Sequence, residues 1–229
     1  MPFSFIKKTT SASGSNPYSV IPDGLTLNLD ASVSSSYPGS GDGSTWFDLS
    51  PSVGYATLYN TSYSNLNGGS IYFDGSALGE VFISTLNSNG YTKQVWVNID
   101  NLGYPNNIIS GDGGSFHYFY PNGSTLFNSG HGFPWPIEGN TQITQNTWIN
   151  IVVTFDTSNG WNMYFNGNLD ASNSTDLNPP SGPGKMLLGA FAGSYNLSGY
   201  MAQVLVYDRA LTAAEVLHNF NVTKTRFGF

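Results

Sequence analysis

Apolar and polar side chains alternate with a period of two along the last third of the chain. In the segment WINIVVTFD, Ile149, Ile151, Val153 and Phe155 fall on one side, and the residues between them fall on the other. A period of two places successive side chains on opposite faces of a sheet. The segment 148–156 is therefore predicted to be a strand. Further strands are expected at 24–31, 54–60, 70–74, 80–85, 92–99, 105–110, 115–120, 161–166, 185–191 and 199–208.

Turn signals separate these strands at short intervals. Asn-Gly between alternating apolar runs favours a type I′ hairpin turn, which needs two positive φ angles. It occurs at Asn159-Gly160, at Asn166-Gly167 and at three earlier positions. In the first strand Leu25, Leu27 and Leu29 are expected to point inward. Turns this frequent leave little room for long helices and predict an all-β chain.

One short helix is expected near the end of the chain. Thr212 and Glu215 match a capping box, in which threonine caps the helix and glutamate reaches back to its first residue. The helix should end near Phe220. The chain then divides into an N-terminal arm (1–22), one sandwich domain (23–220) and a C-terminal tail (221–229).

Composition limits the chemistry that the chain can carry. There is no cysteine among the 229 residues, which excludes disulfides and thiolate catalysis, and only 9% of the residues are charged. The apolar start is too short for a signal peptide, and no apolar run approaches the roughly 20 residues of a membrane helix. A protein without a signal peptide or membrane insertion is expected.

The net charge of −7 is unevenly distributed. Lys7 and Lys8 lie near one end and Lys224 and Arg226 near the other, with no acid in residues 1–8 or 224–229. The interior carries all 14 acids against three basic residues, a net charge of −11. A body this acidic repels phosphate backbones, so nucleic acid is not expected as a partner.

The ordered set of strand sequences resembles a known superfamily. GLTLNLDAS, GGSIYFDGS, QVWVNI, WINIVVTFD and GYMAQVLVYDRALTAAEV together resemble the laminin-G-like, concanavalin A-like jelly-roll superfamily, over about residues 24–220. The variety it is most similar to is frequent in structural proteins of bacteriophages, especially cyanophages. The resemblance implies two antiparallel sheets packed face to face with the termini near each other. It also implies a function among lectins, adhesion modules and glycan-cleaving enzymes.

The acidic residues do not form the pattern of a glycosidase. Glycoside hydrolysis needs paired carboxylates, and related glucanases carry alternating acids on one strand. Here the three glutamates are Glu80, Glu138 and Glu215, and none has an acid two residues away. Many relatives hold calcium beside the FDG turn, but around Asp74 several of those oxygen donors are missing. We therefore predict no enzyme activity, no catalytic residue, no cofactor and no metal site, with calcium left as an open alternative.

Two sets of aromatic residues suggest binding surfaces. The loop 111–139 concentrates aromatic side chains on which a glycan can stack, and the alternative is that they pack across the mouth of the sandwich. The glycan-binding candidates are His117, Tyr118, Tyr120, His131 and Trp135. The two ends combine aromatic rings with cations, as a docking tag would. The docking candidates are Phe3, Phe5, Lys7, Lys8, Lys224, Arg226, Phe227 and Phe229. The alternative is that both ends pack on their own sheets.

The leading hypothesis is a non-enzymatic phage virion protein, either a capsid decoration or a tail or fibre component. It would be assembled in the host cytoplasm, dock through its termini onto other virion proteins as a homo-oligomer, and display a face for cell-surface glycans. Removal of both ends is then expected to abolish docking and leave the sandwich folded. The alternative is a free-standing carbohydrate-binding module.

Overall fold

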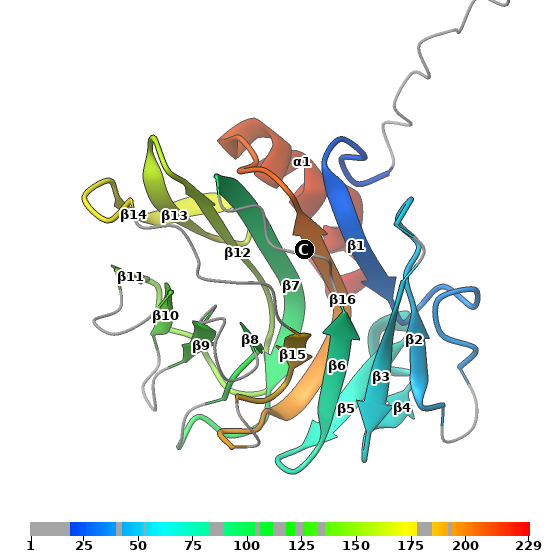
Figure 1. Cartoon of the computed structure of the whole chain (residues 1–229). Coiled ribbons are helices and arrows are strands. Elements are labelled where there is room, and N and C mark those ends of the chain that lie inside the picture. Colours follow the sequence, from blue (N-terminus) through cyan, green and yellow to red (C-terminus); the bar gives the residue numbers. More distant parts are fainter. Residues whose placement is uncertain are drawn as a thin grey trace, which may run out of the picture.

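Two antiparallel sheets lie face to face in the computed structural model, and one short helix covers the outer face of one of them (Figure 1). The structure describes residues 19–39, 43–52, 54–82, 89–103, 106–111, 118–121, 126–131, 136–177, 185–191 and 194–229; for Phe82 and residues 118–121 only the backbone is described. Within these ranges no helix is long and apolar enough to cross a membrane. The predicted fold class, an all-β sandwich with one C-terminal helix, is confirmed.

The back sheet has the strand order β14-β13-β12-β7-β16-β5-β4, and β1 pairs beside β5 along the same edge of β16. Its strands are β1 (Leu25–Asp30), β4 (Ser62–Ser64), β5 (Ser70–Asp74), β7 (Gly90–Ile99), β12 (Trp148–Asp156), β13 (Gly160–Phe165), β14 (Asn168–Asn173) and β16 (Ser198–Tyr207). The alternation predicted along 148–156 is confirmed, because Ile149, Ile151, Val153 and Phe155 all lie in the core between the sheets.

The front sheet has the order β11-β10-β9-β8-β15-β6-β3-β2. Its strands are β2 (Thr45–Phe47), β3 (Tyr55–Tyr59), β6 (Leu78–Phe82), β8 (Ile109–Gly111), β9 (Tyr118–Pro121), β10 (Phe127–Gly130), β11 (Ile137–Glu138) and β15 (Lys185–Leu188). Sequence periodicity did not predict β2, β4, β10, β11 or β14. Four of these are two to four residues long, which is too short for a period of two to be read.

Backbone angles test the predicted hairpin turn at Asn166-Gly167, and strand register tests the predicted inward placement of Leu25. Asn166 (φ 49°) and Gly167 (φ 79°) both adopt the left-handed conformation that the predicted hairpin turn requires. The inward placement of Leu25 is wrong. A register shift between Leu25 and Leu27 turns Leu25 to the outer face, where it packs against the cluster that includes Leu205, Leu211 and Val216.

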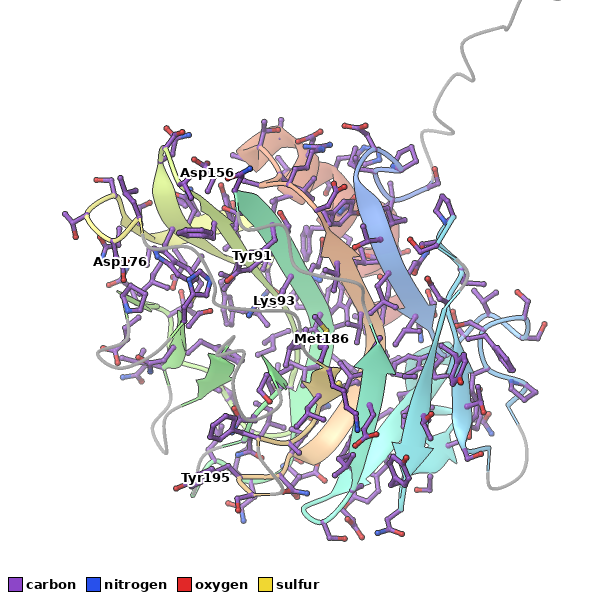
Figure 2. The ribbon with its side chains drawn as sticks, viewed as in Figure 1. Tyr91, Lys93, Asp156, Asp176, Met186 and Tyr195 are labelled. Atoms are coloured by element: carbon purple, nitrogen blue, oxygen red, sulfur yellow. The ribbon has the colours of Figure 1, made fainter. Side chains whose placement is uncertain are left out.

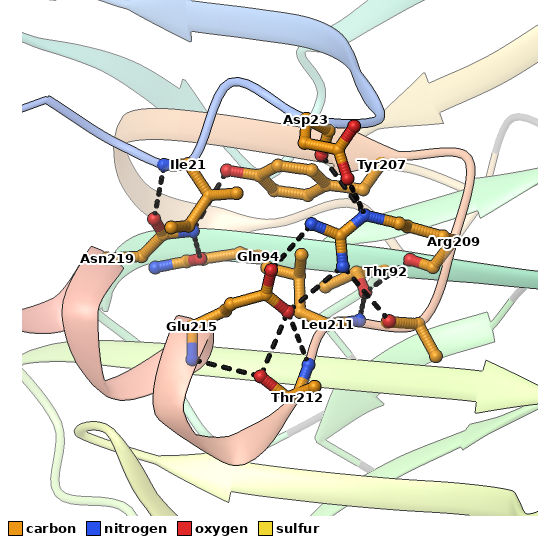
Figure 3. Close-up of polar contacts among 11 residues, drawn as sticks. Ile21, Asp23, Thr92, Gln94, Tyr207, Arg209, Leu211, Thr212, Glu215 and Asn219 are labelled. Atoms are coloured by element: carbon orange, nitrogen blue, oxygen red, sulfur yellow. Dashed lines mark hydrogen bonds and ion pairs between the residues drawn. The ribbon is translucent and has the colours of Figure 1, made fainter. Parts of the chain in front are cut away.

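The helix α1 (Ala213–Thr223) closes the outer face of the back sheet. The capping box predicted at Thr212 and Glu215 is present, and Glu215 also pairs with Arg209 at 2.7 Å. A single turn, η2 (Lys224–Phe227), continues from the helix, so the helical region extends beyond the predicted end near Phe220. Figure 3 shows the polar contacts that fix the helix to the sheet and to the preceding segment.

The helix buries the outer face of β7, which would otherwise be exposed to solvent. Every residue of β7 is buried, because the sheet-to-sheet core covers one face and α1 with η2 covers much of the other. The side chain of Asn219 donates to Gln94 at 3.0 Å and to the Tyr207 hydroxyl at 2.9 Å (Figure 3). The Trp96 indole donates to Thr223 at 2.9 Å. Gln94 and Trp96, on the outer face of this strand, are therefore buried and hydrogen-bonded to the helix.

Candidate functional site

A pocket of about 510 Å³ opens on the outer face of the back sheet, beyond the area that the helix covers. It lies where β7 ends and β12 begins, beside the single turn η1 (Leu66–Gly68). Its lining residues are Leu66, Asn67, Asn98, Asp100, Asn146, Trp148 and Tyr200. Concave sites of this size that mix aromatic rings with a few polar groups are typical of small-molecule binding.

Sheet register creates the floor of the pocket. Trp148 on β12 lies opposite Asn98 on β7, Asn98 lies opposite Tyr200 on β16, and Tyr200 lies opposite Tyr72 on β5. Neighbouring strands are about 4.8 Å apart, so this row of four side chains extends about 14 Å across the sheet. The Tyr72 and Tyr200 rings are 4.7 Å apart between centroids. Trp148 and Asn98 are buried, and the partly exposed members of the row are the two tyrosine rings.

Two buried polar atoms of the floor lack a hydrogen-bond partner within the described ranges. They are the indole nitrogen of Trp148 and the Oδ1 atom of Asn98, which belong to residues that are 8% and 6% exposed. A buried donor or acceptor without a partner costs about 1–3 kcal/mol. Both atoms are covered by neighbouring groups, so they belong to the packing beneath the pocket, and the polar groups at its surface are those of the more exposed lining residues.

Asp100 provides the charge of the pocket. Its backbone N–H donates to Ser198 at 2.8 Å, which fixes it at the end of β7. Partial burial raises the pKa of its carboxyl group, and a hydrogen bond from the Tyr72 hydroxyl acts in the opposite direction. Burial and the Asp100 charge raise the pKa of Tyr72 in turn, so Tyr72 remains a donor at neutral pH. The carboxylate and the row of rings thus belong to one polar arrangement.

The C-terminal turn η2 supports two sides of the pocket. The Phe227 ring lies 3.9 Å from Trp96 and 5.0 Å from Trp148, measured between centroids. Arg226 donates from Nε to the carbonyl of Asn67 at 2.5 Å, and the Asn67 side chain donates back to the Arg226 carbonyl at 2.8 Å. Asn67 adopts a left-handed backbone (φ 50°), a conformation that asparagine tolerates well. The end of the chain therefore holds both the floor and the rim in place.

This arrangement bears on the predicted docking residues. Phe3, Phe5, Lys7 and Lys8 lie outside the described residues. Phe227 is buried, so an exposed role for it is corrected in favour of the alternative, packing on its own sheet. Arg226 forms an ion pair with Asp30 at 2.7 Å and donates a hydrogen bond to the backbone carbonyl of Asn67. Phe229 is 47% exposed and Lys224 is partly exposed, and for these two residues the docking role remains a prediction.

The predicted glycan-binding loop is only partly described. His117 and Trp135 lie outside the described residues, and for Tyr118 and Tyr120 only the backbone of β9 is described. The His131 Nε2 atom lies 2.7 Å from the Tyr91 hydroxyl, and its ring packs on Phe155 and Trp161. His131 thus contacts the inner core, as the packing alternative expects. The loop as a glycan site remains untested.

Three acidic residues that were considered for catalysis or metal binding form ion pairs or stabilise a turn. Glu80 pairs with Lys185 at 3.2 Å, and Glu215 with Arg209. The Asp74 carboxylate accepts hydrogen bonds from the backbone of Ser76 and Ala77, as a turn residue does. In the described part of the chain no group of three or more His, Cys, Asp or Glu side chains is placed to hold a metal ion.

Sequence reasoning missed one titratable residue of the core. Lys93 lies on the inner face of β7, in the space between the sheets with Tyr91 (Figure 2). Its side chain is fully buried, and its ammonium nitrogen lies 5.3 Å from the centre of the Tyr91 ring. Burial lowers the pKa of Lys93 to about 7, because an apolar environment disfavours the charged form.

We predict that Lys93→Met changes how the stability of the protein depends on pH. The unfolded chain binds a proton at Lys93 up to pH of about 10.4, whereas the folded protein releases it near pH 7. The free energy of unfolding of the native protein should therefore rise as the pH is raised from about 7 towards 10. Lys93→Met should flatten this rise, because methionine has no proton to release on folding. Urea denaturation of both proteins at pH 7 and pH 9 measures the difference; a variant with an unchanged slope would contradict it.

Comparison with known proteins agrees with the sandwich. The profile of the concanavalin A-like lectin/glucanases superfamily matches residues 73–217. A comparison with curated protein sequences gave no significant match.

Solved structures with the same fold include domain 4 of AbnA, an extracellular arabinanase from Geobacillus stearothermophilus in complex with arabinotriose. Its TM-score is 0.68 at 19% identity, over 87% of this chain and 98% of that chain. The binding domain of botulinum neurotoxin DC in complex with rat synaptotagmin II has a TM-score of 0.68 at 12% identity, over 88% of this chain and 52% of that chain.

Trypanosoma rangeli sialidase in complex with the inhibitor DANA has a TM-score of 0.69 at 16% identity, over 92% of this chain and 34% of that chain. This chain thus spans about half of the neurotoxin chain and a third of the sialidase chain. At these identities the likeness shows the fold, and the profile shows the family. The chain belongs to the concanavalin A-like lectin/glucanases superfamily.

Proposed function

We propose that this protein is a non-enzymatic carbohydrate-binding module and that its binding site is the pocket floored by Trp148, Asn98 and Tyr200. The observation that carries the proposal is an open pocket of about 510 Å³ that is lined by two aromatic rings, three amide side chains and one carboxylate. Sugar rings place C–H groups against aromatic faces and hydroxyls against amides and carboxylates. This pocket offers all three.

Structural neighbours support the same class of ligand. One is an arabinanase domain in complex with arabinotriose, and another is a sialidase in complex with an inhibitor. Glu80 and Glu215 form ion pairs, and Glu215 also caps the helix. Asp74 stabilises a turn, and Glu138 has no acid two residues away in the sequence. Binding without cleavage is therefore the simplest use of the site. A glycan would bind and dissociate unchanged.

The expected result is that Tyr200→Ala removes most of the signal of the native protein on an array of soluble glycans. The side chain is partly exposed and lies in the floor, so its removal takes away contact surface without opening the core. Tyr55→Ala is the matched control, since Tyr55 is 56% exposed on β3 of the other sheet. We expect at least a tenfold loss of affinity, about 1.4 kcal/mol, for the first variant and none for the second.

The loop predicted from the sequence makes a competing claim for the same activity. Trp135→Ala should leave binding unchanged if the pocket is the site and should erase it if the loop is the site. A native protein that binds no glycan on the array would refute both.

A finer proposal places this module on a phage particle, as a capsid decoration or a tail component. It is supported by the sequence resemblance and by the basic, aromatic segment 1–8 attached to an acidic body. A chain lacking residues 1–8 should then bind glycans normally and fail to enter particles. Normal incorporation would contradict the docking role of this segment.

A further inference from the structure

We propose that the pocket selects neutral sugars over anionic ones and that Asp100 is the residue that sets this selectivity. The inference rests on the proposed glycan-binding function and adds to it the class of ligand. The structural neighbours do not decide between neutral and anionic ligands, because one is a domain in complex with arabinotriose and another is a sialidase in complex with the inhibitor DANA.

The charge of the pocket is negative and is not compensated by the described residues that line it. Asp100 is the one charged side chain among the seven lining residues, and within the described ranges it forms no ion pair. Its one described side-chain contact is the Tyr72 hydroxyl, a neutral donor. The charge of Asp74 also acts on Tyr72, so two carboxylates contribute to the negative surroundings of this ring.

The basic side chain nearest to the rim is already engaged. Arg226 contacts Asn67 and Gly69 through their backbone carbonyls, and its guanidinium forms an ion pair with Asp30 at 2.7 Å. These contacts turn the guanidinium towards the body of the protein, where it completes the rim instead of offering a charge to a ligand. An anionic sugar would therefore meet a carboxylate that no cation among the described lining residues offsets.

Neutral sugars suit the same groups. Two neighbouring hydroxyls can donate to the two oxygens of Asp100, and a further hydroxyl can accept from or donate to the exposed amide side chain of Asn146. A hydrogen bond to a charged acceptor is about twice as strong as one between neutral groups. A sugar carboxylate placed near Asp100 would instead raise the free energy of the complex through like-charge repulsion. The pocket thus combines an attraction for one class with a repulsion of the other, as selective sites commonly do.

The test uses pairs of oligosaccharides of the same length and linkage, one neutral and one with a uronic acid in place of a neutral sugar. Calorimetry on the full-length native protein should show at least tenfold tighter binding of the neutral member. Asp100→Asn keeps the shape and an acceptor for Tyr72 but removes the charge, and it should narrow this ratio at least threefold. Asp208→Asn is the charge-matched control. Asp208 lies eight residues beyond the pocket residue Tyr200, which is about 25 Å in the direction of β16 at about 3.3 Å per residue. This variant should leave the ratio unchanged.

The possible failures are distinct. Equal or tighter binding of the anionic member by the native protein, with loss of binding in Tyr200→Ala, would overturn the selectivity and leave the proposed function standing. A ratio that does not change in Asp100→Asn would overturn the role of this residue. Failure to bind any member of either class would overturn the proposed function, and the selectivity with it.

Discussion

Phe227→Ala is expected to lower the free energy of unfolding by about 3 kcal/mol and to weaken glycan binding at the same time. The ring is 7% exposed and stacks on Trp96 while touching Trp148, so its loss leaves a cavity next to two large rings. With a total stability of about 5–15 kcal/mol for a typical protein, this is a large fraction. Denaturation in urea and calorimetry with the best array ligand measure the two effects.

Phe229→Ala is the matched control for this prediction. Phe229 is two residues further along and 47% exposed, and it reaches Trp96 only at 5.8 Å between ring centroids. It should change stability by less than about 1 kcal/mol. Deletion of Lys224–Phe229 should have at least the effect of Phe227→Ala, whereas the sequence alone predicted that the sandwich would tolerate it. Full stability after the deletion would show that the turn η2 does not support the fold.

Gly199→Ala is expected to destabilise the protein by about 2–4 kcal/mol. Gly199 lies one residue before Tyr200 with φ 151°, and a Cβ atom there would overlap the carbonyl oxygen of Asn98 on the neighbouring strand. The strands β7 and β16 would have to separate or shift in register beneath the pocket, so binding should also be lost.

Gly54→Ala separates this steric effect from the general cost of replacing a glycine. An added Cβ at Gly54 meets no atom closer than 3.7 Å, and Gly54 does not adopt a positive φ. Its thermal midpoint should remain within a few degrees of the native value. Similar midpoints for the two variants would contradict the close approach of the strands at Gly199.

Local patterns predicted much of the fold because they act within one strand or turn. The alternation from Trp148 to Asp156 predicted correctly which side chains point inward. The hairpin turn at Asn166-Gly167 and the capping box at Thr212 were also predicted correctly. β14 was missed because it has mixed polar residues and lies at the edge of the sheet, where no burial pattern is imposed.

The candidate site was missed for a different reason. Asn98, Trp148 and Tyr200 are about 50 residues apart from one to the next, and only the register of three strands brings them into one row. Register between distant strands is not encoded in any short segment, so no local motif marks the pocket. The same limit explains Phe227, since an aromatic residue near a chain end has the same local sequence whether it is exposed or packed on Trp96.

The most direct test of the account follows the indole N–H signals of the five tryptophans by NMR while a neutral oligosaccharide is added. Trp148→Phe and Trp135→Phe identify the two signals that matter. The account predicts that the Trp148 signal shifts in a saturable manner, because the sugar binds in the pocket that the Trp148 ring lines, while the Trp135 signal stays in place. A saturable shift of Trp135 with an unmoved Trp148 signal would contradict it and move the binding site to the loop.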